Sequence, residues 1–134
     1  MAIHKILIVD DSPTERFYLT DILVRAGYTV ATAVNGEEAI GKIRAERPQL
    51  ILMDVVMPGA NGFQVTRSIA RDPELAAIPV IICSSKNQET DRIWGMRQGA
   101  KDYLVKPVDP ALLLGAITRL DQQALAGAVP AVAA

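Results

Sequence analysis

Short apolar runs alternate along the chain with longer segments that carry apolar residues at helical spacing. KILIV (5–9) and LILM (50–53) have the length of strands and are apolar almost throughout, which is typical of central parallel strands covered by helices on both faces. YTVATA (28–33) is less apolar, so we expect this strand at an edge of the sheet. With PVIIC (79–83) and DYLV (102–105), the pattern predicts five β/α units.

Residues that favour helix N-termini precede several of the intervening segments. Ser12, Asn35 and Asp109 stand at such positions, where a side-chain oxygen can accept a hydrogen bond from the first turn of backbone. Pro13 fits the first position of a helix that is predicted over residues 13–26.

The fourth helix is predicted over residues 87–98 and contains Gly95 in its interior. A glycine there costs up to about 1 kcal/mol relative to alanine. We therefore expect this helix to shift more readily than the others.

The chain has 134 residues, which is the size of one domain. We assign this domain to residues 1–121. The remaining segment, residues 122–134, is rich in small residues and includes one proline, and we expect it to be a disordered, alanine-rich tail.

Composition and charge exclude several classes of function. The formal net charge is −1, which gives no attraction to nucleic acid or to an anionic membrane. Cys83 is the only cysteine and His4 the only histidine, so an internal disulfide and a multi-histidine metal site are both excluded. The short apolar stretch near the N-terminus is followed at once by acids, so we expect a cytoplasmic protein.

Polar residues stand directly after the apolar runs. They are Asp10, Asp11, Asp54, Ser84 and Lys106. Parallel strands deliver their carboxyl ends to one edge of the sheet, where such folds build ligand sites. The sequence therefore predicts that three carboxylates, a hydroxyl and an ammonium group form one cluster.

Three adjacent carboxylates repel one another at neutral pH unless a cation lies between them. Mg²⁺ fits because it prefers oxygen ligands and needs only a few carboxylates. A carboxylate can also act as a nucleophile and become an aspartyl phosphate. Asp54 suits that role, since it stands alone after its strand and precedes an open loop, whereas Asp10 and Asp11 suit the metal.

Four motifs occur in the order ILIVDDS, LILMDVVMPGANG, PVIICSS and GAKDYLVKPVD. Over roughly residues 4–121 the chain resembles the CheY-like receiver domains of response regulators. This resemblance implies a flavodoxin-like (βα)5 fold, a doubly wound parallel sheet with strand order 2-1-3-4-5. It also implies that residues 1–121 form the receiver domain.

The same resemblance implies a role for each residue of the cluster. Asp54 would be the phosphoacceptor, Asp11 a direct ligand of Mg²⁺, and Asp10 a ligand through water. The Val56 backbone carbonyl, with the Asp54 carboxylate, would complete the protein's share of the metal site. Lys106 would pair with the phosphoryl group.

Further positions follow the family pattern. Ser84 would be the switch hydroxyl and Tyr103 the aromatic residue whose side chain follows it. A cis bond is implied between Lys106 and Pro107. Val56 and Lys86 occupy positions that tune loss of the phosphoryl group, and both differ from the chemotaxis type.

Partners and output are implied as well. A histidine kinase, or its phosphotransfer domain, would donate the phosphoryl group, and a downstream protein would bind the face formed by the fourth helix, fifth strand and fifth helix. We expect a monomer that binds no nucleic acid and does not insert into a membrane. Several segments resemble stand-alone regulators of type IV pilus twitching motility; alternatives are a chemotaxis-like pathway, a phosphate sink for a kinase with several regulators, or a receiver used only for docking.

Three other classes fit the sequence less well. Phosphate-ester hydrolases that form an aspartyl phosphate need a second acid two residues after the nucleophile on the first strand, but Ser12 stands two residues after Asp10. A flavin-binding module needs a phosphate-cradling loop after that strand, whereas DDSPTE is acidic. A degenerate receiver used only for docking should lack the acids or the lysine, and this chain has them all. We therefore expect a phosphoacceptor signalling protein rather than an enzyme acting on a separate substrate.

Overall fold

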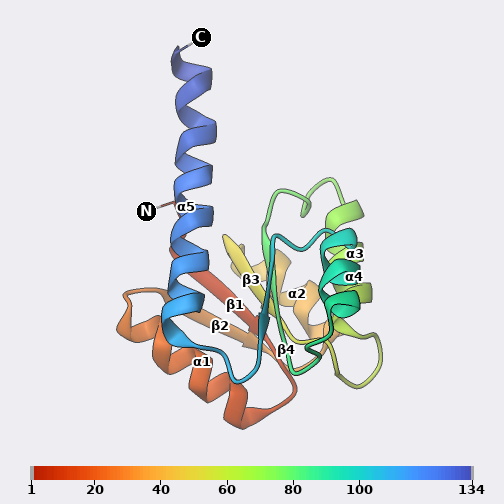
Figure 1. Cartoon of the computed structure of the whole chain (residues 1–134). Helices are drawn as coiled ribbons and strands as arrows, with labels where there is room; N and C mark the ends of the chain where they lie inside the picture. The colour runs from red at the N-terminus through yellow and green to blue at the C-terminus, as the bar shows by residue number, and fades with distance from the viewer. Residues whose placement is uncertain (1, 134) are drawn as a thin grey trace.

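The computed structural model describes residues 2–133, and the side chains of residues 2–124. Strands and helices alternate in chain order (Figure 1). The elements are β1 (Lys5–Val9), α1 (Pro13–Arg25), β2 (Thr29–Ala33), α2 (Gly36–Glu46), β3 (Leu50–Met53), α3 (Gly62–Arg71), β4 (Val80–Ser84), α4 (Glu89–Arg97), β5 (Asp102–Val105) and α5 (Pro110–Ala133).

The five strands form one parallel sheet in the order β2-β1-β3-β4-β5. The predicted fold class and strand order are therefore confirmed, and β2 lies at an edge as expected. Val9 is paired with Met53 in the sheet, so the residues that follow these two strands emerge side by side. The Asp54 amide donates to the Val9 carbonyl oxygen at 2.9 Å, which extends this register to the site.

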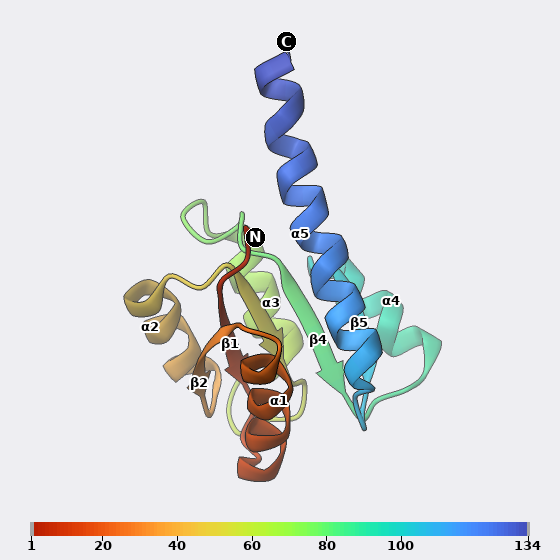
Figure 2. The same ribbon diagram turned by 90° about the vertical axis from the view of Figure 1, so that its left-hand side faces the viewer.

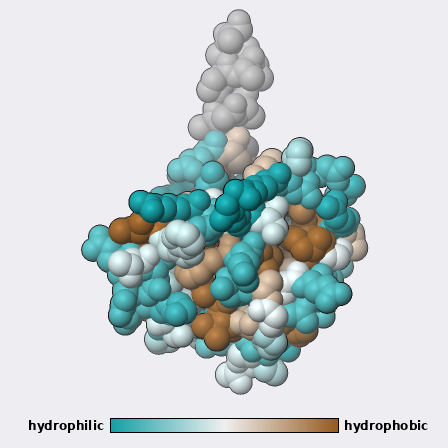
Figure 3. Space-filling model, turned by 90° about the vertical axis from the view of Figure 1, so that its right-hand side faces the viewer, coloured by the Kyte–Doolittle hydropathy of each residue, from teal (hydrophilic) through white to brown (hydrophobic). Residues whose placement is uncertain are grey.

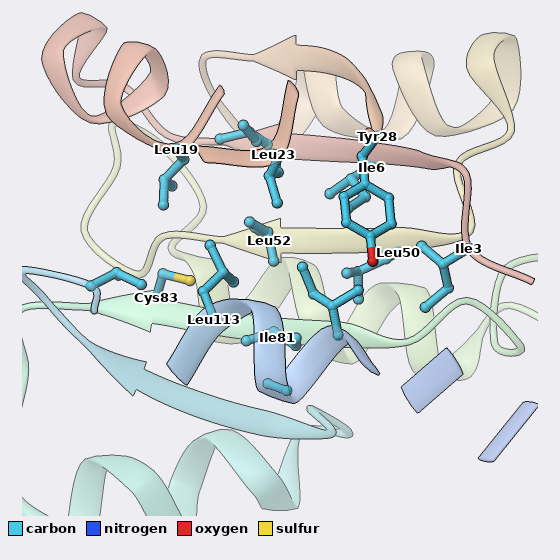
Figure 4. Packing of buried hydrophobic residues seen from close by; sticks show 14 residues of the cluster. Ile3, Ile6, Leu19, Leu23, Tyr28, Leu50, Leu52, Ile81, Cys83 and Leu113 are labelled. Atoms are coloured by element: carbon cyan, nitrogen blue, oxygen red, sulfur yellow. The ribbon is translucent and has the colours of Figure 1, made fainter. Parts of the chain in front are cut away.

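Helices cover both faces of the sheet because the central strands are apolar on both sides. Ile8 and Leu52 face a cluster with residues of α1 and α5, part of which Figure 4 shows. Leu7 and Ile51 face a second cluster with residues of α2 and α3. Figure 2 shows the sheet between these layers.

Cys83 is buried in the first cluster, where burial raises the pKa of its thiol to about 12.

The predicted helix caps are confirmed by hydrogen bonds. The Glu15 amide donates to Ser12 Oγ at 3.3 Å, and the Glu38 amide donates to Asn35 Oδ1 at 2.8 Å. Asp109 Oδ1 accepts from the second residue of α5 at 2.8 Å. Each bond satisfies a backbone donor that the helix itself leaves without a partner.

The last helix continues beyond the expected domain boundary. Its backbone is helical to Ala133, so a boundary after Asp121 falls within α5 (Figure 1). Alanine has the highest helix propensity, which favours extension of an existing helix into such a sequence. The side chains of residues 125–134 lie outside the described residues, and the division into a receiver domain and a tail stays a prediction.

The beginning of the chain is tied to α5. Asp121 is buried, and its Oδ1 accepts a hydrogen bond from the Ile3 amide at 2.9 Å. Within the part of the chain that was searched, no helix has both the length and the apolar character that a membrane span requires.

Gly95 packs α4 tightly against the sheet. The helix begins two residues later than predicted, at Glu89, and Gly95 is buried within it. A Cβ on Gly95 would lie 2.8 Å from Ile82 Cδ1, 3.1 Å from Tyr103 Cδ2 and 3.3 Å from Phe63 Cε1. The absence of a side chain therefore permits close packing, while the expected mobility of α4 stays a prediction.

Gly95→Ala should destabilise the protein by about 1–3 kcal/mol, because overpacking outweighs the better helix propensity of alanine. Gly41→Ala is the matched control, since a Cβ on Gly41 in α2 has no neighbouring atom within 4 Å. That substitution should stabilise by about 1 kcal/mol or less. Urea denaturation of both variants measures the difference, and equal effects of the same sign would contradict the packing role of Gly95.

Candidate functional site

Three carboxylates converge at the carboxyl edge of the sheet. Asp10 and Asp11 follow β1 and Asp54 follows β3, and one carboxylate oxygen of each lies within 4.8 Å of the others. Asp10 and Asp54 are buried, whereas Asp11 is exposed. The structure thus brings together the three acids that the sequence places at strand ends.

Lys106 places a positive charge between two of these acids. Its Nζ lies 2.8 Å from Asp10 Oδ2 and 3.2 Å from Asp54 Oδ1. The Lys106 amide donates to the Ser84 carbonyl oxygen at 2.8 Å, which holds the residue at the end of β5 beside β4. The bond between Lys106 and Pro107 is cis, as expected.

The pKa values of Asp54 and Lys106 are both raised, for different reasons. Burial, and next the charge of Asp10, raise the pKa of Asp54, and Lys106 opposes this only in part. Burial alone lowers the pKa of Lys106, but its hydrogen bond to Asp10 and the charges of both acids outweigh that effect and raise the pKa. The ionised Asp54 is therefore energetically costly, whereas the ammonium group is held in its charged form.

These acids form a donor set that suits a divalent cation. All of them supply oxygen ligands, and burial, followed by the charge of Asp10, raises the pKa of Asp54 although Lys106 lies beside it. Mg²⁺ prefers such oxygen donors and retains several waters, so a few carboxylates are enough. The side chains present therefore fit the Mg²⁺ ion that the sequence implies.

The loop after β1 is held in place by the groups around Asp10. Asp10 Oδ1 accepts from the Ser12 amide at 2.9 Å, and the Arg16 guanidinium donates to the Asp10 carbonyl oxygen at 2.7 Å. These bonds fix the backbone between β1 and α1. The loop that carries Asp10 and Asp11 is therefore held in one conformation.

Sequence reasoning gave no role at the site to Gly62, which lies against the backbone of Asp54, and did not find the buried oxygen of Glu15 in the first turn of α1. A Cβ on Gly62 would overlap the Asp54 carbonyl oxygen, so the loop after β3 can close over Asp54 only with glycine there. The sequence signal was the GANG segment of the second motif. Glu15 Oε2 is buried and makes no hydrogen bond within the described chain; its place in a helix cap gave no sign of this.

Ser84 and Tyr103 meet at the loop that follows β4. Ser84 is fully buried, and its Oγ accepts a hydrogen bond from the Lys86 amide at 3.1 Å. Tyr103 is 2% exposed, and its hydroxyl donates to the Lys86 carbonyl oxygen at 2.8 Å. Burial raises the pKa of Tyr103. The Lys86 backbone therefore joins the two residues that the sequence assigns to a switch.

Val56 and Lys86 lie on the loops after β3 and β4, respectively. Val56 is 59% exposed, and the Lys86 side chain is exposed as well. Both side chains are therefore accessible from the solvent, and within residues 2–124 the Lys86 ammonium forms no ion pair with the acids.

Comparisons with known proteins agree with this geometry. The family described as response regulator receiver domain matches residues 6–118. Protein PilH of Pseudomonas aeruginosa is 56% identical over 113 residues, covering 84% of this chain and 93% of that protein. The chemotaxis protein CheY of Thermotoga maritima is 37% identical over 120 residues, covering 88% of this chain and 98% of that protein.

Solved structures show the same architecture. The chemotaxis protein CheY4 of Vibrio cholerae superimposes with a TM-score of 0.81 at 32% sequence identity, covering 87% of this chain and 98% of that one. A putative response regulator from Chloroflexus aurantiacus gives a TM-score of 0.83 at 32% identity, covering 87% and 96% of the respective chains.

Asp54→Asn should raise the free energy of unfolding at pH 7 without Mg²⁺, by about 0.5–3 kcal/mol, the common range for single substitutions. Because the folded-state pKa of Asp54 is raised, wild-type stability falls as pH rises from the unfolded pKa through the folded one. The advantage of the variant should therefore vanish below about pH 4. Denaturant unfolding across pH measures it.

Asp21→Asn is the control for this experiment, because Asp21 forms an exposed pair with Arg25. It should change the free energy of unfolding by about 0.5 kcal/mol or less at any pH. Addition of Mg²⁺ should stabilise the wild type and reduce the advantage of Asp54→Asn. A variant less stable than wild type at pH 7 in the absence of Mg²⁺ would contradict the electrostatic argument.

Proposed function

Because this chain belongs to the response regulator receiver domain family, we propose that Asp54 accepts a phosphoryl group from a phosphohistidine in a two-component relay. The observation that supports this most directly is the buried Asp54 carboxylate with the Lys106 ammonium 3.2 Å away and two further acids beside it. This arrangement offers a nucleophile, a cation for the transferred group and a metal site at one sheet edge.

In the proposed transfer, a carboxylate oxygen of Asp54 attacks the phosphorus atom. The new P–O bond forms as the P–N bond to the donor imidazole breaks, and the electron pair of that bond stays on the imidazole nitrogen. The Lys106 ammonium pairs with the phosphoryl oxygens, for which it is already placed beside Asp54. Mg²⁺ bound by Asp10, Asp11, Asp54 and the Val56 carbonyl would supply further neutralisation of the phosphoryl charge.

After transfer, the phosphoryl group carries about −1.5 to −2 of charge at the edge of the sheet, in place of the −1 of the Asp54 carboxylate. Ser84 can respond because its hydroxyl is buried at the end of β4, where its Oγ accepts a hydrogen bond from the Lys86 amide. Rotation of that hydroxyl towards the phosphoryl group would add a hydrogen bond to an anion, which is stronger than one between neutral groups. The Lys86 segment would then lose a bond to Ser84.

Tyr103 connects this change to the outer surface. Its hydroxyl is bonded to the Lys86 carbonyl oxygen, and its ring lies against Gly95 of α4. We assign the inward position of Tyr103 to the signalling form. Movement of the Lys86 loop would therefore reach α4, where Ile93 and Trp94 are exposed.

The proposed partners follow from these two surfaces. A histidine kinase or its phosphotransfer domain would approach the acids, and a downstream protein would bind the face of α4, β5 and α5, which also exposes Val105. The 56% identity to PilH supports a role in a type IV pilus motility pathway.

Acetyl phosphate with Mg²⁺ should add one phosphoryl group to the protein, detectable by intact mass and removed by hydroxylamine. Asp54→Ala or EDTA should abolish the adduct. Asp21→Ala is the matched control, because this exposed acid lies outside the cluster, and it should be modified like the wild type. Equal modification of Asp54→Ala and wild type would overturn the assignment of the nucleophile.

Ser84→Ala should separate phosphorylation from the switch. The Ser84→Ala protein should still form the phosphoryl adduct. The change in Trp94 fluorescence on phosphorylation should be much smaller than in the wild type, and Trp94 is the only tryptophan. Ser85→Ala, at the exposed neighbouring position, is the control and should behave like the wild type. An unchanged fluorescence response in Ser84→Ala would contradict the role of the Ser84 hydroxyl.

A further inference from the structure

A hollow with basic walls lies between the C-terminal ends of α3 and α4. It has a volume of about 310 Å³ and is lined by Arg67, Ala70, Arg71, Arg97, Gln98 and Gly99. The Lys101 amide nearby donates to the Val80 carbonyl oxygen, which places this region where β4 and β5 begin. The hollow therefore lies at the edge of the sheet opposite the acids. Figure 3 faces the side that carries α3 and α4 and shows hydrophilic side chains around smaller apolar patches.

The positive charge of this hollow is not neutralised by neighbouring acids. Among the described side chains, none of Arg67, Arg71 and Arg97 forms an ion pair, whereas Arg25, Arg44, Arg92 and Arg119 each contact a carboxylate. Lys101 adds a further charge in an adjoining hollow that shares Ala70 and Gly99. The net charge of the whole chain is −1, so this concentration does not reflect a generally basic protein.

Helix stability explains only part of this arrangement. Arg71 and Arg97 lie in the last turns of their helices, where a positive charge interacts favourably with the helix dipole. Arg67 lies one turn before Arg71 on the same face of α3 and gains less from that effect. The interaction with the helix dipole therefore does not account for Arg67 in the wall of the hollow.

Gln98 adds a neutral polar group to the wall. The residue is 7% exposed, and its side-chain amide makes no hydrogen bond to any described group and is open to the solvent. The side chain lines the hollow, so a bound molecule can supply a hydrogen-bond partner. Gly99 has φ +110°, and a Cβ there would lie 2.8 Å from Ala70 Cβ. The floor between the arginines is thus built from small groups.

We propose that this hollow is a binding site for a small molecule that carries a diphosphate group. Three guanidinium groups match the charge of a diphosphate, and arginine binds phosphate through paired hydrogen bonds. The Gln98 amide can donate one further bond. The volume is at the lower end of small-molecule sites, and no aromatic residue lines the hollow, which disfavours stacking of nucleic-acid bases.

The site does not depend on the phosphoacceptor role of Asp54, and binding can therefore be tested in EDTA. Inorganic pyrophosphate should bind saturably to the wild-type protein with one-to-one stoichiometry, measured by calorimetry and by Trp94 fluorescence. Trp94 is a suitable reporter because it lies one helical turn before Gln98. The backbone N–H of Gln98 donates a hydrogen bond to the Trp94 carbonyl oxygen at 3.1 Å. Tighter binding of a nucleoside diphosphate than of pyrophosphate would identify an organic diphosphate as the ligand class; equal binding would identify the diphosphate group alone.

Arg67→Gln and Arg97→Gln should each weaken pyrophosphate binding about tenfold or more, because each removes charge-assisted hydrogen bonds. Both side chains are exposed, so the substitutions leave the core unchanged. Lys42→Gln is the matched control: this lysine lies outside the hollow and forms no ion pair among the described residues, and its loss should leave affinity within about twofold.

Four results would overturn the proposal. The first three are the absence of saturable binding, equal weakening by Lys42→Gln and the arginine variants, and loss of binding in Lys106→Met with full binding in the arginine variants. The third result would place the ligand at the acids. Tighter binding of a glutamate-rich peptide than of either diphosphate would also overturn it, because the hollow would then be a protein-docking surface.

Discussion

The ion pair between Lys106 and the two buried acids is the interaction on which the site depends. One ammonium group contacts both Asp10 and Asp54, which arrive from different strands, while the lysine itself comes from the end of a third. If the lysine were removed, two buried carboxylates would face each other without compensation, which is among the most costly arrangements in a protein interior. The cluster therefore links β1, β3 and β5 electrostatically as well as functionally.

The sheet register makes this interaction possible. Val9 pairs with Met53, and the Lys106 amide bonds to the Ser84 carbonyl oxygen, so the functional groups lie at the same level without any long excursion of the chain. A close backbone approach at Gly62 then brings the loop after β3 against Asp54, and Gly95 lets α4 pack against Ile82 of β4 and Tyr103 of β5. Electrostatics and close packing thus restrict the same small region, where a change in charge can alter packing.

The strands and helices could be predicted from the sequence because each depends on residues that are close together in the chain. Apolar runs predicted the strands, and Ser12, Asn35 and Asp109 predicted helix starts through short-range hydrogen bonds. The convergence of the acids followed from the geometry of parallel strands. The strand order, in contrast, came from the family resemblance, because local patterns do not specify which strands are neighbours.

The contacts that sequence reasoning missed are long-range ones. The buried oxygen of Glu15 depends on how α1 lies on the sheet, and the role of Gly62 depends on the path of the loop over Asp54. Gly95 was interpreted as a weak point of α4, although its neighbours come from β4, β5 and α3. The helical backbone beyond Asp121 was missed for a local reason. An alanine-rich sequence is compatible with both a disordered tail and a helix, so composition alone does not distinguish them.

The hydrogen bond between Asp121 and Ile3 has a consequence for joining this protein to others. It fastens the first residues of the fold to a point well along α5, so the start of the chain and the last helix hold each other in place. A reporter or effector module grafted after Asp121 would preserve that fastening and could be carried on a helical stalk. A graft even one residue earlier would leave a buried amide without its acceptor and loosen the opposite end of the polypeptide.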